Sequence, residues 1–531
     1  GGLISGLSLA LMALGAVAYR YQRRMRGRQL ATAGRVAKNS FAPLASNVSS
    51  RLISFGFSIF YFRVLDPSRI GDYVVAVTVW LFMDTVIGFG LAQFVARDVA
   101  RDKNQTSRYL SNAVAVRLGL SVLVGGPVAL TAAGLAHFGR LAPDLPLVLG
   151  LLIAGFVPAA VSNVVSHVFD GHELMEYRAF SEVLTSIVNV ALGVSFILAG
   201  LGIVGLALAA LLTNVFTAGL FAVLFVRRLG RPRLQLDAGL LARILRGAYP
   251  IMLNQLLVVL FFKIDVPILR AFRASAEVAV YGAAYKFVDA MLIVPANFVP
   301  AVFPILSRQA ASERDALRRG YETTLKVLLL ISLPALAAFE VYAGDIMHAF
   351  FGDKYAASAG ALRILMLFLP FSYANGLIQY ILVALDRQKT MLRFFGVTAI
   401  FNIAANLALI PRFGYLAAAA VTAASEAVLL APLAWLAGRE LKAMAVLPRV
   451  AWRPAMAAAA AGLVMFAVRS LAGSGFLTLA ASGLAGIGAY VLLLAGLRTF
   501  SSEEFALARG LFRQGNPLLP SASGGERAGL P

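Results

Sequence analysis

"FFKIDVPILRAFRASAEVAVYGAAYKFVDAML", residues 261–292, combines strongly apolar flanks with four charged residues, Lys263, Asp265, Lys286 and Asp289. The flanks are as apolar as a membrane span, so these charges would lie within the bilayer. On insertion scales each charge at that depth costs about 2.5–3.5 kcal/mol. Because intramembrane charges are expensive, the stretch predicts a membrane protein in which they serve a function.

The composition of the whole chain supports this class. Hydrophobic residues make up 60% of the chain and charged residues 14%, whereas soluble domains carry about 25% charged residues. The net charge of +21 would suit nucleic acid only with a soluble basic domain, and no long soluble stretch is present. With no cysteine and four unclustered histidines, the sequence predicts no metal site and no nucleic-acid partner. His167 and His172 are interpreted as interfacial residues.

Apolar stretches of about 20 residues, separated by short polar loops, predict transmembrane helices. An extra helix is expected at about 3–19. The six spans of a first series are expected at 41–62, 72–96, 109–136, 146–168, 179–199 and 203–226. Those of a second series are expected at 247–270, 278–303, 321–343, 360–384, 394–410 and 415–437. Two more, at 454–472 and 476–497, complete an all-α membrane protein of fourteen transmembrane helices, with the extra N-terminal helix in addition.

The distribution of lysine and arginine orients these spans. Placing residues 20–40 in the cytoplasm puts 33 of the 47 basic residues on that side and seven on the other. Cytoplasmic loops are enriched in lysine and arginine, so this placement fixes the orientation. The extra helix then starts outside, and the Pro/Gly/Ser-rich tail is expected to be a disordered cytoplasmic segment.

The two series of six spans repeat each other. "LAGLGIVGLALAALLT" (198–213) aligns with "IPRFGYLAAAAVTAAS" (410–425), and other pairs follow at offsets of about 207 to 213. Two parallel six-helix bundles with a cleft between them are expected, an architecture in which one bundle rocks against the other. The predicted divisions are 1–38 (extra helix and basic segment), 39–230 and 231–440 (the bundles), 441–500 (two added helices) and 501–531 (tail).

Several stretches of the sequence resemble the polysaccharide exporters of the O-antigen flippase type. The resemblance is carried by residues 261–287, "FYFRVLDPSRIGDYVVA" (60–76), "GFGLAQFVARDVAR" (88–101), "FFGDKYAASAGALRIL" (350–365) and "IPRFGYLAAAAVTAASE" (410–426). These exporters belong to the superfamily of multidrug exporters and the lipid II flippase. The resemblance covers about residues 40–500, and the helix at 3–19 departs from the family's plan.

The resemblance implies a transporter, not an enzyme, that flips undecaprenyl-pyrophosphate-linked oligosaccharide across the bacterial inner membrane by alternating access. It implies membrane lipids and the polysaccharide polymerase machinery as partners, and no cofactor other than an H⁺ or Na⁺ gradient. A lipid II flippase and an ion-coupled multidrug antiporter of the same superfamily are the alternatives. A glycosyltransferase is disfavoured because the longest internal loop, 227–246, is basic and carries no acidic metal-binding pair.

Basic residues inside spans are the candidates for binding an anionic pyrophosphate, because arginine and lysine suit phosphate oxygens. These substrate-binding candidates are Arg51, Arg117, Lys263 and Lys286. Acidic candidates for ion coupling or charge compensation are Asp84, Asp265, Asp289 and Glu426.

Alternative roles remain open for several of them. Lys286 and Asp289 could form an internal ion pair, and Lys263 could extend outward to the interface. Arg51 and Asp84 lie near mid-membrane, so they are expected to face the cleft, where they could pair.

Uncharged polar residues and prolines give weaker indications. Several Asn and Gln side chains could bind sugar hydroxyls, although bonding between helices is favoured for most of them. They are Asn47, Asn189, Asn254, Gln255, Asn375, Gln379, Asn402 and Asn406. Pro295, Pro300 and Pro304 indicate either a hinge or a simple packing kink.

Overall fold

The computed structural model describes residues 30–139, 141–444, 446–473 and 476–499. Over these residues the elements are helices, with no strand among them, so the expected all-α class is confirmed. Twelve helical segments of the described residues are long and apolar enough to cross a membrane, which makes the chain a multi-pass membrane protein. The expected helix at 3–19 and the tail at 501–531 lie outside the described residues.

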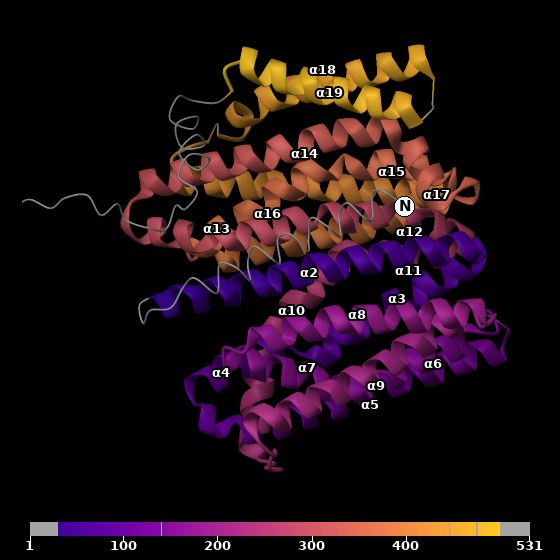
Figure 1. Cartoon of the computed structure of the whole chain (residues 1–531), viewed down its shortest axis with the longest axis vertical. Helices are drawn as coiled ribbons and strands as arrows, with labels where there is room; N and C mark the ends of the chain where they lie inside the picture. Colours follow the sequence, from indigo (N-terminus) through magenta and orange to yellow (C-terminus); the bar gives the residue numbers. More distant parts are fainter. Residues whose placement is uncertain (1–29, 140, 445, 474–475, 500–531) are drawn as a thin grey trace, which may run out of the picture.

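The helices fall into two successive sets and a final pair (Figure 1). The first set is α2 (Leu30–Val64), α3 (Pro67–Gly88), α4 (Leu91–Arg101), η1 (Lys103–Gln105), α5 (Thr106–His137), α6 (Leu145–Ala154), α7 (Phe156–Gly171), α8 (Met175–Leu198) and α9 (Gly202–Leu229). The second set is α10 (Ala238–Lys263), α11 (Asp265–Phe272), α12 (Ser275–Met291), α13 (Ile293–Ser312), α14 (Arg314–Phe351), η2 (Asp353–Tyr355), α15 (Ser358–Met366), α16 (Phe368–Ala384) and α17 (Gln388–Glu440). The final pair is α18 (Val446–Ala472) and α19 (Phe476–Gly496).

Two counts differ from the sequence expectation, and each has a local cause. α2 is not among the twelve apolar segments, because Asn47, Arg51 and several serines interrupt its apolar residues. The expected spans 394–410 and 415–437 form one continuous element, α17, which leaves helical geometry at Gly414 (φ 59°, ψ −139°). With α2 added and α17 counted as two, the expected spans from 41 to 497 each have a helical counterpart.

Several expected single spans are broken in the middle. α7, α11, α13 and α16 each follow such a break, and each has proline as its third residue: Pro158, Pro267, Pro295 and Pro370. Proline has no N–H and is tolerated in the first turn of a helix, so it favours a new helix start at these points. The α3–α4 break has another cause, since Phe89 and Gly90 both adopt left-handed backbone conformations.

The second and fourth spans are broken in both sets, which is the regularity that a duplicated unit would give. In Figure 1 the first set occupies the lower part of the molecule and the second set the upper part. α18 and α19 lie at the top, where α18 packs on α14. α10 lies between the two parts and contacts α3, α4 and α5 as well as α17. We call α2–α9 the first half and α10–α17 the second half.

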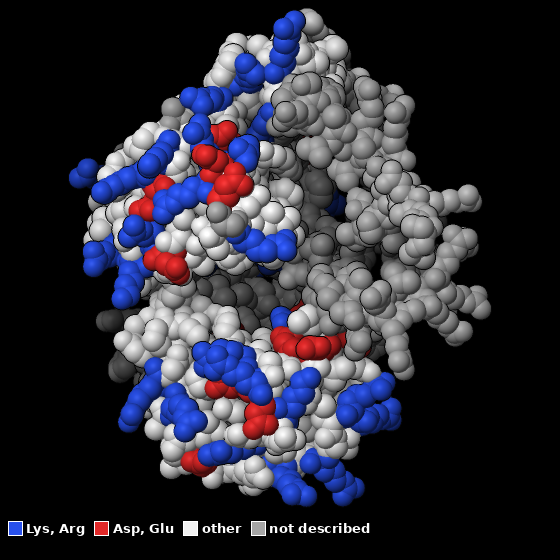
Figure 2. Space-filling view, turned by 90° about the vertical axis from the view of Figure 1, so that its left-hand side faces the viewer, with Lys and Arg blue, Asp and Glu red and all other residues white. Residues whose placement is uncertain are grey.

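The end of the molecule at the left of Figure 1 corresponds to the predicted cytoplasmic side. Figure 2 views this end, where lysine and arginine side chains gather on both the upper and the lower part. The surface is hollowed between the two parts. The hollow and its basic rim face the side on which the sequence places most positive charge.

Candidate functional site

A cavity of about 710 Å³ lies between the two halves, and we call it the central cavity. Its walls are α2, α7, α8 and α9 of the first half, with α12 and the start of α13 from the second half. Serine and threonine make up half of the polar lining residues. The serines among the lining residues include Ser50, Ser54, Ser58, Ser162, Ser166 and Ser181. A polar cavity at membrane depth can hold water and hydrophilic cargo, which the surrounding lipid cannot.

The halves close against each other at the end predicted to face outward. There Ser275 on α12 donates a hydrogen bond to Asp72 on α3 at 2.5 Å, and Arg270 lies 3.5 Å from the same carboxylate. α3 and α12 approach so closely that a Cβ on Gly71 would lie 1.7 Å from the Ser275 carbonyl oxygen. We call Gly71, Asp72, Arg270 and Ser275 the outer latch. With the latch formed, the central cavity lies on its cytoplasmic side.

Two of the predicted phosphate-binding residues line the central cavity without a carboxylate partner. Arg51 donates its Nε hydrogen bond to the Asn47 side-chain oxygen at 2.8 Å, and no ion pair of Arg51 is found among the described residues. Lys286, on α12, makes no hydrogen bond or ion pair with any other described residue. These two side chains line the cavity from different halves, and neither forms an ion pair with another described residue.

The third predicted base, Lys263, is paired. Its Nζ lies 3.5 Å from the carboxylate of Asp289 and 3.6 Å from the centre of the Tyr285 ring. The internal ion pair considered for Lys286 and Asp289 is not found, and α10 supplies the partner of Asp289. Asp289 itself lines the central cavity, whereas Lys263 is not among the lining residues.

The fourth base, Arg117, pairs with Asp84 at 2.8 Å, across α5 and α3. The pairing of Asp84 with Arg51 that the sequence left open is therefore not found. The Arg117–Asp84 pair lines a second cavity of about 380 Å³, which we call the side cavity. Asn163 and His167 of α7 line both cavities, so the two adjoin along that helix.

Two predicted acids lie away from both cavities. Asp265 is 2% exposed and accepts hydrogen bonds from the hydroxyls of Tyr281 and Thr422 and from the Val266 N–H. Glu426 is equally buried and accepts a hydrogen bond from the Asn375 side chain at 2.6 Å. The structure thus places both carboxylates inside the helix packing of the second half, not against the cargo route.

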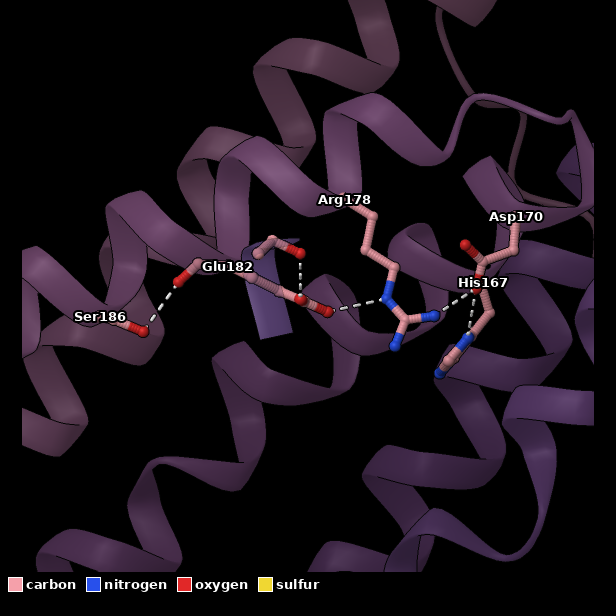
Figure 3. A network of polar contacts seen from close by, with 6 residues as sticks. His167, Asp170, Arg178, Glu182 and Ser186 are labelled. Atoms are coloured by element: carbon pink, nitrogen blue, oxygen red, sulfur yellow. Dashed lines mark hydrogen bonds and ion pairs between the residues drawn. The ribbon is translucent and has the colours of Figure 1, made fainter. Parts of the chain in front are cut away.

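A polar network at the cytoplasmic end of the central cavity was not predicted (Figure 3). Arg178 on α8 bonds to both Asp170 (2.7 Å) and Glu182 (2.9 Å). His167 lies 3.1 Å from Asp170, and Ser46 donates to Glu182 at 3.1 Å. The i, i+4 spacing of Arg178 and Glu182 is the signal that could have revealed it. Because two carboxylates surround Arg178, its charge is compensated, unlike that of Arg51.

The two histidines near this network have separate partners. His172 lies in the α7–α8 connection, where its Nε2 is 2.8 Å from the Thr106 hydroxyl. Burial, and to a smaller extent the nearby Lys103, lowers the pKa of His172. Among the described residues no group of three or more His, Cys, Asp or Glu side chains is arranged to hold a metal ion.

Comparison with known proteins gives two family matches. The profile described as "Polysaccharide biosynthesis protein" matches residues 36–310, more than half of the chain. The profile described as "MatE" matches residues 250–408.

Curated relatives match over shorter segments. The protein named "Probable low-salt glycan biosynthesis flippase Agl15" from Haloferax volcanii is 24% identical over 165 residues, covering 31% of this chain and 35% of that protein. "Probable flippase AglR" from the same organism is 25% identical over 163 residues, covering 30% and 34%. The matched segment thus spans about a third of the length of each relative.

Solved structures share the fold. The lipid II flippase MurJ in its inward closed conformation superposes with a TM-score of 0.69 at 14% identity, covering 88% of this chain and 99% of that chain. A multidrug resistance MATE transporter of the MOP superfamily, in an inward-facing conformation, gives 0.64 at 19% identity over 74% and 95%. The MurJ- and MATE-like fold is therefore shared despite the low sequence identity.

Proposed function

Because this chain belongs to the polysaccharide biosynthesis protein family, we propose that it is a transporter that flips a lipid-linked oligosaccharide across the membrane. The observation that carries the proposal is a pair of cations without an ion pair among the described residues, Arg51 and Lys286, in a polar cavity between two halves. Such a cavity suits a cargo with an anionic phosphate group and a hydrophilic glycan. The proposed cargo is an undecaprenyl-pyrophosphate-linked oligosaccharide in the bacterial inner membrane.

The chemistry of the cavity fits a pyrophosphate. The Arg51 guanidinium offers several N–H donors in a fixed plane, and the Lys286 ammonium adds a compact positive charge. Neither cation forms an ion pair with a carboxylate of the described residues, so both are available to bind the cargo. Asp289 and Glu182, which also line the cavity, are held by Lys263 and Arg178.

The transport cycle proposed here is alternating access. In the described conformation the outer latch is closed and the cavity lies on the cytoplasmic side, where a lipid-linked glycan is assembled before export. Opening of the latch and closure of the cytoplasmic end would expose the same cavity outward. Delivery to a polysaccharide polymerase and use of an H⁺ or Na⁺ gradient belong to the same proposal.

An ion-coupled multidrug antiporter is a second candidate, favoured by the MatE match over residues 250–408. Multidrug cargo that is cationic would be repelled by Arg51 and Lys286, so this candidate predicts faster transport when they are neutralised. A lipid II flippase shares the anionic pyrophosphate and differs in the glycan and peptide carried. Transport of lipid II compared with other lipid-linked glycans distinguishes it.

The experiment compares Arg51→Gln and Lys286→Met with the parent protein in proteoliposomes that contain an undecaprenyl-pyrophosphate-linked oligosaccharide. A membrane-impermeant oxidant of sugars reports how fast the glycan reaches the outer face. We expect each variant to lower the rate at least about tenfold, because a charge-assisted hydrogen bond contributes about 1.5–3 kcal/mol.

Matched control variants are Arg412→Gln and Lys354→Met, which remove exposed charges that do not line the cavity. Both controls should transport at the parental rate. Parental rates in Arg51→Gln and Lys286→Met, with normal insertion into the vesicles, would refute the proposed role of the cavity.

A further inference from the structure

The side cavity differs from the central cavity in its charge. Its two charged residues of opposite sign, Asp84 and Arg117, neutralise each other at 2.8 Å. Arg117 is 7% exposed, so its guanidinium is built into the wall, whereas 34% of the Asp84 side chain is exposed. The side cavity is therefore polar but close to electroneutral, and it offers no reason for a phosphate to prefer it over the central cavity.

Amide side chains supply most of the remaining polar lining. Asn254 and Gln255, adjacent on α10, make no side-chain hydrogen bond with other described residues. Other amides that the sequence singled out do bond to protein: Asn375 to Glu426, Asn402 to Ser425 and Asn406 to Asn402. An unpaired amide in a membrane span is costly unless water or a ligand satisfies it. Gln379 also makes no side-chain hydrogen bond with other described residues, but it lines neither cavity, so Asn254 and Gln255 are the unpaired amides of this set whose partner would lie in the side cavity.

α3 and α7 add acceptors to the lining, and α10 itself adds an apolar surface. Thr85 donates its hydroxyl hydrogen to the Leu81 carbonyl at 2.8 Å, which leaves the oxygen lone pairs free to accept. The Asn163 amide nitrogen is bonded to the Ala159 carbonyl, so its side-chain oxygen remains as an acceptor. Val258 and Val259 complete the lining with aliphatic surface. Uncharged donors and acceptors beside a small apolar wall match a sugar ring, which has hydroxyls at its edge and C–H groups on its faces.

From this contrast we infer that the side cavity is a binding subsite for an uncharged sugar residue of the cargo, with Asn254, Gln255 and Thr85 as its specificity-determining residues. This inference rests on the proposed function, because it divides the cargo between two compartments. The phosphates lie with Arg51 and Lys286 in the central cavity, and a sugar lies beyond α7 in the side cavity. The shared lining residues Asn163 and His167 mark the passage between them.

The test measures binding to the full chain in lipid nanodiscs. The probes are undecaprenyl pyrophosphate itself and a set of undecaprenyl-pyrophosphate-linked mono- and disaccharides, some neutral and some carrying a carboxylate. We expect at least one neutral glycan to raise the affinity above that of the bare lipid. The variant Asn254→Leu with Gln255→Met keeps side-chain volume and removes two amides. It should lower the affinity for that glycosylated lipid by about 30-fold. Its affinity for bare undecaprenyl pyrophosphate should be unchanged.

Control variants separate the two compartments. Gln379→Met removes an intramembrane amide that lines neither cavity, so it should bind every probe like the parent. Arg51→Gln with Lys286→Met should lose affinity for the bare lipid and for the glycosylated lipids alike. Thr85→Val gives an independent variant on α3 if the double variant does not fold, and it should lower only the glycan-dependent gain.

Three results would overturn the inference. Retention of the full glycan-dependent gain in the side-cavity variants would place the sugar elsewhere. A gain found only with acidic glycans would contradict a neutral subsite. If glycosylated probes bind no more tightly than the bare lipid, and the bare lipid still binds, the protein does not recognise the sugar. Failure of the parent to bind even the bare lipid would instead remove the proposed function itself.

Discussion

At the scale of single residues, the partner of a charge decides its role more than its depth in the membrane. Lys263 and Lys286 lie in the same short region of sequence, yet Lys263 is paired with Asp289 and Lys286 is not. The sequence could identify both as costly intramembrane charges, and it could suggest that Arg51 faces a cleft. It could not assign the partners, because Arg117–Asp84 and Lys263–Asp289 each join residues of different helices whose packing is not encoded locally.

A first prediction at this scale concerns the buried carboxylate of Asp265. Tyr281→Phe removes the hydroxyl that donates a hydrogen bond to it, so the carboxylate loses one of its partners inside the second half. We expect the variant to be destabilised by about 1–3 kcal/mol, the cost of an under-satisfied buried polar group. Thermal unfolding of the purified protein in detergent measures the effect.

The matched control for this prediction is Tyr380→Phe. Its hydroxyl makes no hydrogen bond with other described residues, while its ring packs on Phe303. It should unfold at the parental temperature. Equal unfolding temperatures for Tyr281→Phe and Tyr380→Phe would mean that the Tyr281 hydroxyl does not support Asp265.

At the scale of helices, the positions of the spans follow from hydropathy, whereas their interruptions follow from particular residues. Pro158 and Pro295 mark where α7 and α13 begin after a break, and such prolines can be read from the sequence. The α3–α4 break at Phe89 and Gly90 carries no proline and was not anticipated. α2 shows the converse, because its serines and Arg51 face the central cavity and weaken the apolar signal of a helix that contributes to the cavity wall.

A second prediction concerns the turn inside α17. Gly414 has a positive φ of 59°, and a Cβ there would lie 2.3 Å from a Glu277 carboxylate oxygen. Gly414→Ala should therefore destabilise the protein by about 1–3 kcal/mol, through backbone strain and displacement of Glu277. The unfolding temperature and the yield of folded protein in membranes report this loss.

Gly360→Ala in α15 is the comparison for Gly414→Ala. Its added Cβ would meet nothing closer than a Leu416 methyl group at 3.6 Å, an ordinary contact, and its backbone is helical. It should match or slightly exceed the parental stability. If Gly414→Ala behaves in the same way, the strain assigned to the α17 turn does not exist.

At the scale of the whole molecule, the two halves meet at the end that carries the outer latch, and α10 also packs on α3, α4 and α5. Arg63 near the end of α2 adds to this contact by donating to the Phe350 carbonyl at 2.7 Å, and Phe62 packs on Phe351 and Tyr355. The repeat in the sequence could predict two bundles and a cleft. It could not predict which end of the cleft is closed, because that depends on surface contacts between helices far apart in the chain.

A third prediction tests motion at the latch and uses the absence of natural cysteines from the chain. Asp72→Cys with Ser275→Cys places two thiols where the side chains now share a hydrogen bond. Oxidation should join them and hold the halves together, so transport of lipid-linked glycan should fall to the background rate and return after reduction. Protection of the thiols from maleimide labelling measures the extent of the cross-link.

Each single cysteine variant is the control, since it cannot form the internal bridge and should transport equally before and after oxidation. Full cross-linking with undiminished transport would show that the latch does not open during the cycle.

The arrangement of the latch has a consequence for how such carriers diversify. Gly71 lies against the main-chain oxygen of Ser275, and Arg63 donates hydrogen bonds to the main-chain oxygens of Ala349 and Phe350. Several contacts that close this end are therefore made to backbone atoms and do not depend on the partner side chain. The residues proposed to discriminate between glycans lie outside the latch, on α3 and α10. Recognition and sealing can then mutate independently, and grafting the α10 amides of one relative onto another offers a route to exchange cargo while the outer latch is left unchanged.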